Sequence, residues 1–485
     1  MKYLHLGIVD IHNHILAGDV TPLELVQEAL SSAKNDDNNA FEYICEKEAL
    51  AAVKKLDPKK KNNLLYGIPV VIKDNFSTKD IPTTESSDML KGYIPVYSAE
   101  VINRLENEGA IVIAKSTMDE LAMGGKGING HLGITYNPWD KEKKRIVGGS
   151  SSGSAVSVAA GIVPFALGSD TGDSVRKPAS YNGLVGFKPS WGRISRFGLL
   201  PFSSSLDHVA YFTRNIQDAA IVLNVLAGRD DKDMTSSFKP VEDYCAHLNE
   251  PIKGKKIAVI KGVIDSASDQ RVVNIFNKNI EELRKLGAII ETVEIDTKIL
   301  KSIYPTYIII SSAESTSNNA CLDGIKFGPK AEGNTYEEIV FNSRTKGFSA
   351  SAKKRFIIGG YSLLKENRDS LFVRAQKCRH LIVDTFNGIL SRYDVIYCPA
   401  APSIAPLINE KPDVLSDQYL ISDNYLAVAN MGGLPSITIP LGIIDGFPIG
   451  GNLTSKAFDE SNLLSIASGI EKTTNLKDLY VQKVK

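Results

Sequence analysis

Short apolar runs alternate with amphipathic segments along this chain. Residues 67–73 (Gly-Ile-Pro-Val-Val-Ile-Lys) and 110–114 (Ala-Ile-Val-Ile-Ala) have the apolar character of buried strands. Between them, Val101, Ile102 and Leu105 recur at helical spacing, and Ser98 is the expected cap. Strand, helix and strand in this order are typical of a parallel sheet covered by helices.

The same order recurs later in the chain. A strand is expected at residues 256–260, a helix at 270–286 and a strand at 288–290. Further elements are a helix that starts at Pro22 after the cap Thr21, a mostly helical region at about 300–390, and strands at 395–398 and 436–440. The fold class expected from this pattern is α/β, with a mixed, mostly parallel sheet covered by helices on both faces.

The charge balance changes what this fold can be expected to do. The 485 residues include 56 Lys plus Arg and 56 Asp plus Glu, so the formal net charge is zero. Nucleic-acid binding through phosphates requires clustered positive charge, so a self-sufficient nucleic-acid binder is not expected. A length of 485 residues alone suggests about three domains.

Neither export nor a membrane span is indicated by the sequence. The longest apolar stretch, residues 155–167, is interrupted by Ser157, Gly161 and Pro164 and is too short to span a bilayer. The five cysteines are far apart and form no Cys-x-x-Cys pair, so neither a zinc site nor a disulfide framework is expected. We therefore expect a reduced, cytoplasmic protein.

One segment differs from the rest in composition. Residues 147–205 contain 10 Gly and 13 Ser but only 7 charged residues, and apolar side chains are interleaved among them. Glycines let backbone N–H groups approach a ligand closely, and serines add hydroxyls without bulk. This segment is therefore interpreted as backbone that surrounds a small-molecule site.

Three short motifs offer competing chemistry. His12 and His14 would share one face of a strand, as metal ligands do, but no further ligands stand in a matching context. Ser151 fits the nucleophile position of G-x-S-x-G, but the run 141–145 before it is loop-like and only His208 or His380 could serve as base. Lys126 follows two glycines, but the other residues of a phosphate-binding loop motif are absent.

A distributed motif is more specific. Lys73 ends an apolar strand, and burial should lower its pKa and free a neutral amine as a base. A serine needs such a base to act as a nucleophile, and Ser150 and Ser151 lie in the Gly/Ser-rich segment. The turn 171–174 could direct its N–H groups at a developing oxyanion.

At these residues the chain resembles the amidase signature family. Within that family it is similar to the A subunits of glutamyl-tRNA(Gln) or aspartyl-tRNA(Asn) amidotransferases. The resemblance extends over residues 20–475, and besides the motif above it rests on residues 118–124, 203–207, 311–314, 322–328 and 429–435.

The resemblance implies a role for each site residue. Ser174 would be the nucleophile, Ser150 a bridging serine after a cis peptide bond, and Lys73 the base. Backbone amides of Thr171, Gly172, Asp173 and Ser174 would form the oxyanion hole. Arg355 would bind the carboxylate of glutamine and Asp423 its ammonium group. The supporting residues would be Ser151, Asp170 and Arg176.

The chain departs from the family pattern at several positions. Asp173 stands where the family usually has Gly, Ser152 replaces another Gly, and Val147 replaces a Pro. The run Lys126-Gly127-Ile128 replaces a polar segment that lines the glutamine pocket. A carboxylate next to a developing oxyanion should cost transition-state stabilisation unless it points away.

The resemblance implies a glutaminase that supplies ammonia to a tRNA-dependent amidotransferase, with Glu-tRNA(Gln) or Asp-tRNA(Asn) as acceptor. The implied complex is a heterotrimer with B and C subunits, in which tRNA, ATP and Mg²⁺ belong mainly to the B partner. No metal or cofactor is expected in this chain. The alternatives are a free-standing amidase and a catalytically impaired assembly subunit. Because the site residues span 350 positions, we expect a single domain over residues 1–485. Its catalytic core would lie at about 60–215, and the segments at about 300–390 and 415–435 would complete the pocket.

Overall fold

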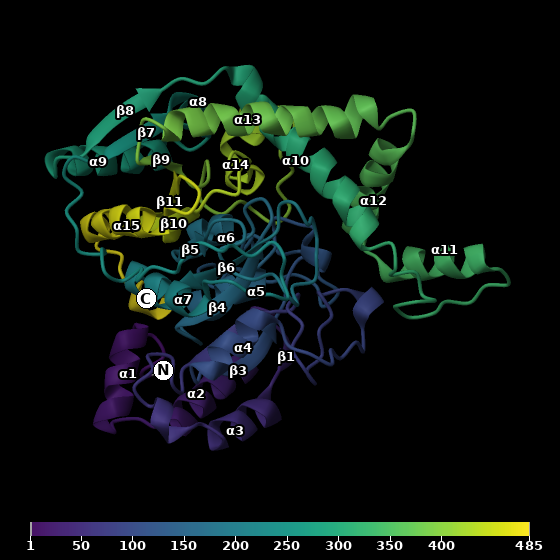
Figure 1. Cartoon of the computed structure of the whole chain (residues 1–485), viewed down its shortest axis with the longest axis horizontal. Coiled ribbons are helices and arrows are strands. Elements are labelled where there is room, and N and C mark those ends of the chain that lie inside the picture. Colours follow the sequence, from purple (N-terminus) through teal and green to yellow (C-terminus); the bar gives the residue numbers. More distant parts are fainter. Residues whose placement is uncertain (1, 485) are drawn as a thin grey trace.

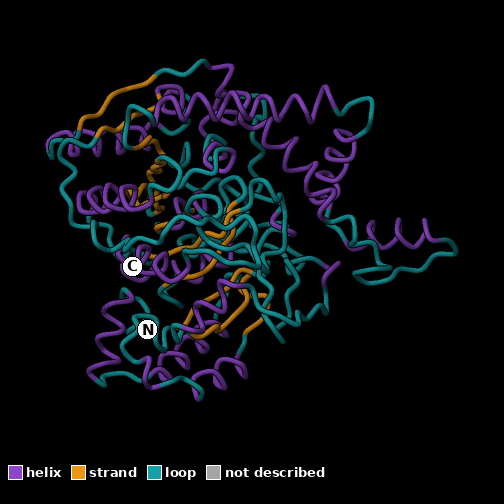
Figure 2. The backbone as a smooth tube through the Cα atoms, in the orientation of Figure 1, coloured by secondary structure: helices purple, strands orange, loops and turns teal. Residues whose placement is uncertain are grey.

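The apolar runs of the sequence lie side by side as strands of one sheet (Figure 2). The computed structural model describes residues 2–484. Within them, eleven strands are ordered β1-β3-β2-β4-β6-β5-β10-β11-β9-β7-β8. The strands are β1 Phe41–Ile44, β2 Pro69–Lys73, β3 Ile111–Ser116, β4 Phe165–Asp170, β5 Val185–Lys188, β6 His208–Thr213, β7 Lys256–Ile260, β8 Ile289–Val293, β9 Val395–Pro399, β10 Ser436–Ile444 and β11 Phe447–Ser455.

Helices surround this sheet, with α1 to α3 at one end of it and α10 and α13 at the other (Figure 1). The α-helices are α1 Ile8–Ala17, α2 Pro22–Lys34, α3 Glu46–Lys54, α4 Glu100–Asn107, α5 Ser152–Ala159, α6 Arg176–Asn182, α7 Ile216–Leu226, α8 Lys261–Asp265, α9 Gln270–Lys285, α10 Thr297–Asn318, α11 Tyr336–Gly347, α12 Ala350–Leu363, α13 Arg374–Leu390, α14 Ala427–Met431, α15 Glu460–Thr474 and α16 Val481–Val484. Short 3₁₀ or π turns are η1 Pro58–Lys60, η2 Asp88–Leu90, η3 Glu120–Ala122, η4 Asp369–Val373 and η5 Gln418–Ser422.

The expected α/β class with a mixed sheet is confirmed, but the expectation of mostly parallel pairing is wrong. Parallel pairs occur in two groups, β2 with β3 and β4, and β7 with β8 and β9. The other six pairings of the described sheet are antiparallel. A strand buried on both faces has the same apolar pattern in either orientation, so the sequence could not distinguish the two.

Several local expectations hold and two do not. Thr21 caps α2 in a full capping box with Glu24, because the Thr21 hydroxyl accepts from the Glu24 amide at 3.2 Å. Ser98 does not cap α4; its hydroxyl accepts from the Lys79 amide at 3.0 Å instead. The segment around His12, considered as a strand, is helix α1.

The parallel pairing of β2 with β4 places the functional residues. The register aligns Ile72 with Leu167, so both strands end at the same edge of the sheet. β2 ends with Lys73, and β4 continues into Ser169 and Asp170. Carboxyl ends of neighbouring parallel strands are common ligand sites in α/β proteins.

Candidate active site

Lys73 is a fully buried lysine with two hydroxyl neighbours. Its Nζ atom lies 2.8 Å from Ser150 Oγ and 2.9 Å from Ser169 Oγ. Burial lowers the pKa of Lys73 to about 7, although the carboxylates of Asp119 and Asp170 oppose the change. A substantial fraction of Lys73 is therefore a neutral amine at neutral pH, in hydrogen-bond reach of a serine.

Ser150 is positioned by the backbone around it. The Gly149–Ser150 peptide bond is cis, as the resemblance implied. The Asp119 amide donates to the Ser150 carbonyl at 3.1 Å, and a Cβ on Gly149 would lie only 2.0 Å from Asp119 Oδ2. Glycine is required at position 149 because the Asp119 side chain occupies that space.

The same Asp119 carboxylate organises the loop that departs from the family pattern. Its oxygens accept from the amides of Gly127 at 3.0 Å and Ile128 at 3.0 Å. The run from Lys126 to Ile128 is thereby fixed against the segment that carries Ser150.

Ser151 links the serine pair to the expected nucleophile. Its amide donates to the Ser174 carbonyl at 3.2 Å, and its hydroxyl donates to the Ser169 carbonyl at 3.1 Å. Ser174 is 3% exposed, whereas Ser150 and Ser151 are fully buried. The structure therefore brings Lys73, Ser150 and Ser174 into one buried cluster, and Ser151 supports it.

The turn from Thr171 to Ser174 connects β4 to α6. The Thr171 hydroxyl donates to Asp207 Oδ1 at 2.7 Å, which fixes the start of the turn. Within residues 2–484, the backbone amides of Gly172, Asp173 and Ser174 donate to no protein acceptor. Unpaired amides next to a serine are the donors that an oxyanion hole requires.

Asp170 and Arg176 hold the two ends of this turn. Asp170 Oδ1 lies 2.9 Å from Arg176 Nη2, and both side chains are fully buried. Arg176 also donates to the Gly172 carbonyl at 2.7 Å. Burial alone would raise the pKa of the Asp170 carboxyl, but Arg176 outweighs it and holds that pKa well below its ordinary value. The expected supporting role of this pair agrees with its contacts.

Asp173, the departure from the family pattern next to the expected nucleophile Ser174, forms an ion pair. Its Oδ2 atom lies 2.7 Å from Lys177 Nζ, one helical turn later. The Lys177 ammonium also donates to the backbone carbonyl of Asp423. Asp423 is partly buried, and burial raises the pKa of its carboxyl. The family resemblance implied a substrate-binding role for Asp423, and Lys177 joins it to the turn from Thr171 to Ser174.

Arg355 approaches the site from α12. Its Nη1 atom lies 3.3 Å from Ser311 Oγ on α10, and its guanidinium group lies 5.8 Å from the Tyr307 ring centre. The Tyr307 ring also packs on Gly172, where an added Cβ would lie 2.9 Å from it. Tyr307 thus lies between Arg355 and the turn from Thr171 to Ser174.

Several residues at the site were missed by the sequence reading. Ser169 contacts Lys73 directly, and Asn75 donates to the Ser169 hydroxyl at 2.9 Å. Asn430 accepts from Arg176 at 2.6 Å and donates to Asp170. Ser169 directly precedes the expected supporting residue Asp170, and Asn430 lies in the segment 429–435 that carries the family resemblance, so both had a signal in the sequence. Tyr307 had none, because its contacts at the site are distant in sequence.

The competing motifs lose their structural basis. His12 and His14 lie on a helix, and His14 pairs with Asp19. No group of three or more His, Cys, Asp or Glu side chains in the described chain could hold a metal ion. His208 faces the Leu206 carbonyl at 2.7 Å and His380 pairs with Asp384, so neither is arranged as a base for Ser151. Lys126 donates to the Glu410 carbonyl at 2.9 Å.

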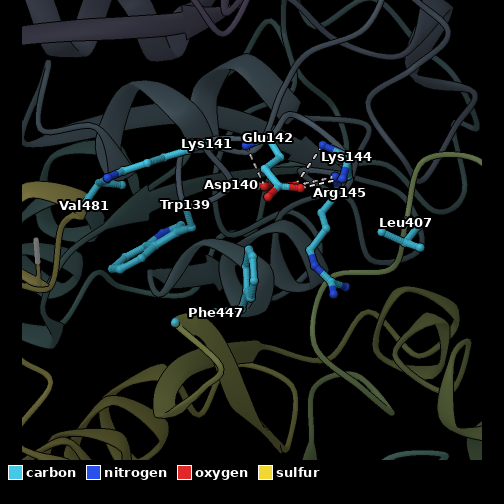
Figure 3. A pocket seen from close by; sticks show the side chains of 10 residues that line it. Trp139, Asp140, Lys141, Glu142, Lys144, Arg145, Leu407, Phe447 and Val481 are labelled. Atoms are coloured by element: carbon cyan, nitrogen blue, oxygen red, sulfur yellow. Dashed lines mark hydrogen bonds and ion pairs between the residues drawn. The ribbon is translucent and has the colours of Figure 1, made fainter.

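A separate surface cavity of about 460 Å³ lies elsewhere, between Trp139, Arg145 and Phe447 (Figure 3). The Asp140 carboxylate in it accepts from the backbone amides of Lys144 and Arg145, each at 2.8 Å. Its lining includes none of the residues assigned to the site above.

The similarity to known proteins extends over the whole chain. The family model described as Amidase matches residues 24–464. The chain is 40% identical to the A subunit of glutamyl-tRNA(Gln) amidotransferase from Pediococcus pentosaceus, over 98% of each protein. It also resembles the crystal structure of the A subunit of glutamyl-tRNA(Gln) amidotransferase from Thermotoga maritima, with a TM-score of 0.80, 32% identity and coverage of 98% and 96% of the two chains. The native peptide amidase from Stenotrophomonas maltophilia matches with a TM-score of 0.80, 26% identity and 98% coverage of each chain.

Proposed function

The chain belongs to the amidase family, and on that basis we propose that it is the glutamine-hydrolysing A subunit of a tRNA-dependent amidotransferase. The observation that carries the proposal is the 2.8 Å contact between the buried Lys73 amine and the Ser150 hydroxyl, next to Ser174. Identity of 40% over 98% of a subunit of that name supports the choice of reaction within the family.

The proposed mechanism uses the three residues in sequence. Neutral Lys73 accepts a proton from Ser150, and Ser150 accepts one from Ser174, whose oxygen attacks the side-chain amide carbon of glutamine. The amides of the turn 171–174 stabilise the oxyanion. Ser150 then donates its proton to the leaving nitrogen and recovers one from Lys73, and ammonia departs. Water then attacks the glutamyl ester by the same proton route and releases glutamate.

Recognition of glutamine is assigned to two opposite charges. Arg355 would bind the α-carboxylate, in the bidentate manner that guanidinium groups favour. Asp423 would bind the α-ammonium group. A zwitterionic substrate gains from both charges, whereas a neutral amide gains from neither.

The remaining parts of the reaction are proposed to lie in partner subunits of the B and C types. Ammonia would pass to the partner that holds Glu-tRNA(Gln) or Asp-tRNA(Asn), where ATP and Mg²⁺ activate the acceptor carboxylate. This division agrees with the zero net charge of the chain, which gives it no surplus of cations for tRNA phosphates. No helix among residues 2–484 combines the length and apolar character needed to cross a membrane.

The test is glutamine hydrolysis by the assembled complex. Ser174→Ala should lower kcat by roughly 10³-fold or more, because the nucleophile is lost. Ser391→Ala, at an exposed serine at the end of α13, is the matched control and should keep full activity. Unchanged glutaminase activity in Ser174→Ala would refute the proposal.

A free-standing amidase is the alternative, and peptide amidase has the same fold. A free-standing amidase should hydrolyse simple amides without partner subunits, and substitution of Arg355 should not change the rate. Ordinary turnover of a neutral amide together with no activity on glutamine would favour this alternative. An assembly subunit without catalysis would leave Ser174 unlabelled by a fluorophosphonate.

A further inference from the structure

We infer that Lys177 is a positioning residue that holds the Asp173 carboxylate away from the oxyanion donors and ties the nucleophile turn to the segment around Asp423. This inference rests on the proposed function, since it concerns the same site. It explains how the chain can carry an acidic residue directly before its nucleophile.

The difficulty that Lys177 resolves is electrostatic. Asp173 is partly buried and lies one position before Ser174, and its own amide belongs to the expected oxyanion hole. A free carboxylate there would repel the negative charge that forms in the transition state, and partial burial would make the repulsion stronger than in water. Arg176, the nearest arginine in sequence, is already occupied by Asp170.

Lys177 is placed to neutralise this charge. The Lys177 amide donates to the Asp173 carbonyl at 2.9 Å, so the two residues lie one helical turn apart at the start of α6. Their side chains form an ion pair of 2.7 Å, with 11% of the Lys177 side chain and 18% of the Asp173 side chain exposed. Solvent therefore screens the pair little. Burial would lower the pKa of Lys177, but Asp173 and Asp423 outweigh it and raise that pKa above its ordinary value, so the ammonium stays charged.

The second contact of Lys177 reaches a distant part of the chain. Its Nζ atom donates to the carbonyl of Asp423, which follows the turn η5 and lies 246 positions later in the sequence. The Lys177 side chain thus links the turn that carries the nucleophile to Asp423, the residue proposed to bind the ammonium group of glutamine. Loss of Lys177 would remove a positive charge next to the carboxylates of Asp173 and Asp423. It would also break the link between the turn that carries the nucleophile and the segment around Asp423.

Two effects are therefore separable. Neutralisation of Asp173 acts on the transition state and should appear in kcat, whereas fixation of Asp423 acts on substrate binding and should appear in KM. If the role of Lys177 were merely structural, its loss would change the melting temperature, and the changes in kcat and KM could not be assigned separately to Asp173 and Asp423.

The experiment compares Lys177→Gln, Asp173→Gly and the double variant in the assembled complex, with glutamine kinetics, the rate of Ser174 labelling by a fluorophosphonate, and thermal melting. Lys177→Gln should lower kcat and the labelling rate on the order of 10- to 100-fold and raise KM for glutamine. Asp173→Gly/Lys177→Gln should recover kcat and labelling to within about threefold of the unchanged protein, while KM stays raised. Lys261→Gln, which breaks the exposed i,i+4 pair with Asp265, is the matched control and should change nothing.

Full rates in Lys177→Gln, or a double variant as slow as the single one, would overturn the inference. A KM that is not raised in either lysine variant would overturn the part that concerns Asp423. If Lys177→Gln does not fold, the double variant is compared with Asp173→Gly, where equal kcat values support the inference and a slower double variant overturns it. Fluorophosphonate labelling reads the effect even if glutamine proves not to be the substrate, so failure of the proposed function remains distinguishable.

Discussion

The Nζ atom of Lys73 lies 2.8 Å from the hydroxyl oxygen of Ser150, although 77 positions separate the two residues in the sequence. Both side chains are fully buried, so the contact is screened from water. The pH dependence of catalysis should depend on this pair.

We expect kcat/KM for glutamine to rise with pH through about 7. Burial lowers the pKa of Lys73 to about 7, and only the neutral amine formed above that pH can accept a proton from Ser150. The measurement is a profile of kcat/KM between pH 5.5 and 9. A rate that still rises at pH 9 without levelling off, as expected for an ordinary lysine with a pKa of about 10.4, would contradict the assignment.

Ser169→Ala should lower kcat by roughly 10-fold, because Ser169 Oγ is the second hydroxyl at Lys73, 2.9 Å from Nζ, and helps to orient the amine. The control is Ser157→Ala, another buried serine, whose hydroxyl donates to the Ser154 carbonyl on α5 away from the amine. Equal rates for both variants would show that Ser169 does not position Lys73.

Arg355→Ala should raise KM for glutamine by roughly 100-fold, because it removes the cation proposed to bind the carboxylate, and hydrolysis of a neutral amide should not change. Lys354→Ala removes an exposed charge of the same sign from the adjacent position of α12 and should leave KM unchanged. If both variants bind glutamine normally, Arg355 does not bind the substrate carboxylate.

Asp170→Asn should reduce the free energy of unfolding by about 3–5 kcal/mol, because Arg176 would remain buried without its countercharge. Denaturant unfolding measures the change. Asp231→Asn is the control, since Asp231 pairs with Arg229 while 94% exposed, and such a pair contributes about 0–1 kcal/mol. A loss of less than about 1 kcal/mol for Asp170→Asn would contradict this account.

His131 should stabilise the fold in a pH-dependent way. Its ring nitrogens lie 2.9 Å from Glu42 and 3.1 Å from Asp88, and hydrogen bonding to Glu42 is the main cause that raises the pKa of His131 to about 9. Because the folded value exceeds the ordinary value of about 6.5, this stabilisation is complete below pH 6.5 and is lost as pH rises through about 9. His131→Gln should therefore lower the melting temperature clearly at pH 6 and little at pH 10, and an equal effect at both values would refute the ion pairs.

Local elements were predictable where the signal was local. Thr21 was expected to cap the helix that starts at Pro22, and this cap is confirmed; the structure adds Glu24, which completes a capping box. Apolar runs such as the one that ends at Lys73 also formed the expected strands. The antiparallel centre of the sheet was not predictable, since the pairing of β4 with β6 depends on which strands meet.

The chemistry of the site was determined by the sequence itself. The motifs around residues 73, 150 and 174 resemble the amidase family, that resemblance implied a Ser-Ser-Lys arrangement, and the family is confirmed. Chemical identity is a property of each side chain, so no coordinates were needed to read it.

Only the tertiary structure decided how these groups behave. The lowered pKa of Lys73 comes from burial beneath elements far along the chain, and the Asp173 carboxylate next to the expected nucleophile is paired with Lys177. Tyr307 reached Gly172 and Arg355 by packing of α10 alone. Burial and ion pairing both depend on residues that are distant in the sequence. The free energy of a charged group therefore depends more on these contacts than on its neighbours in the sequence.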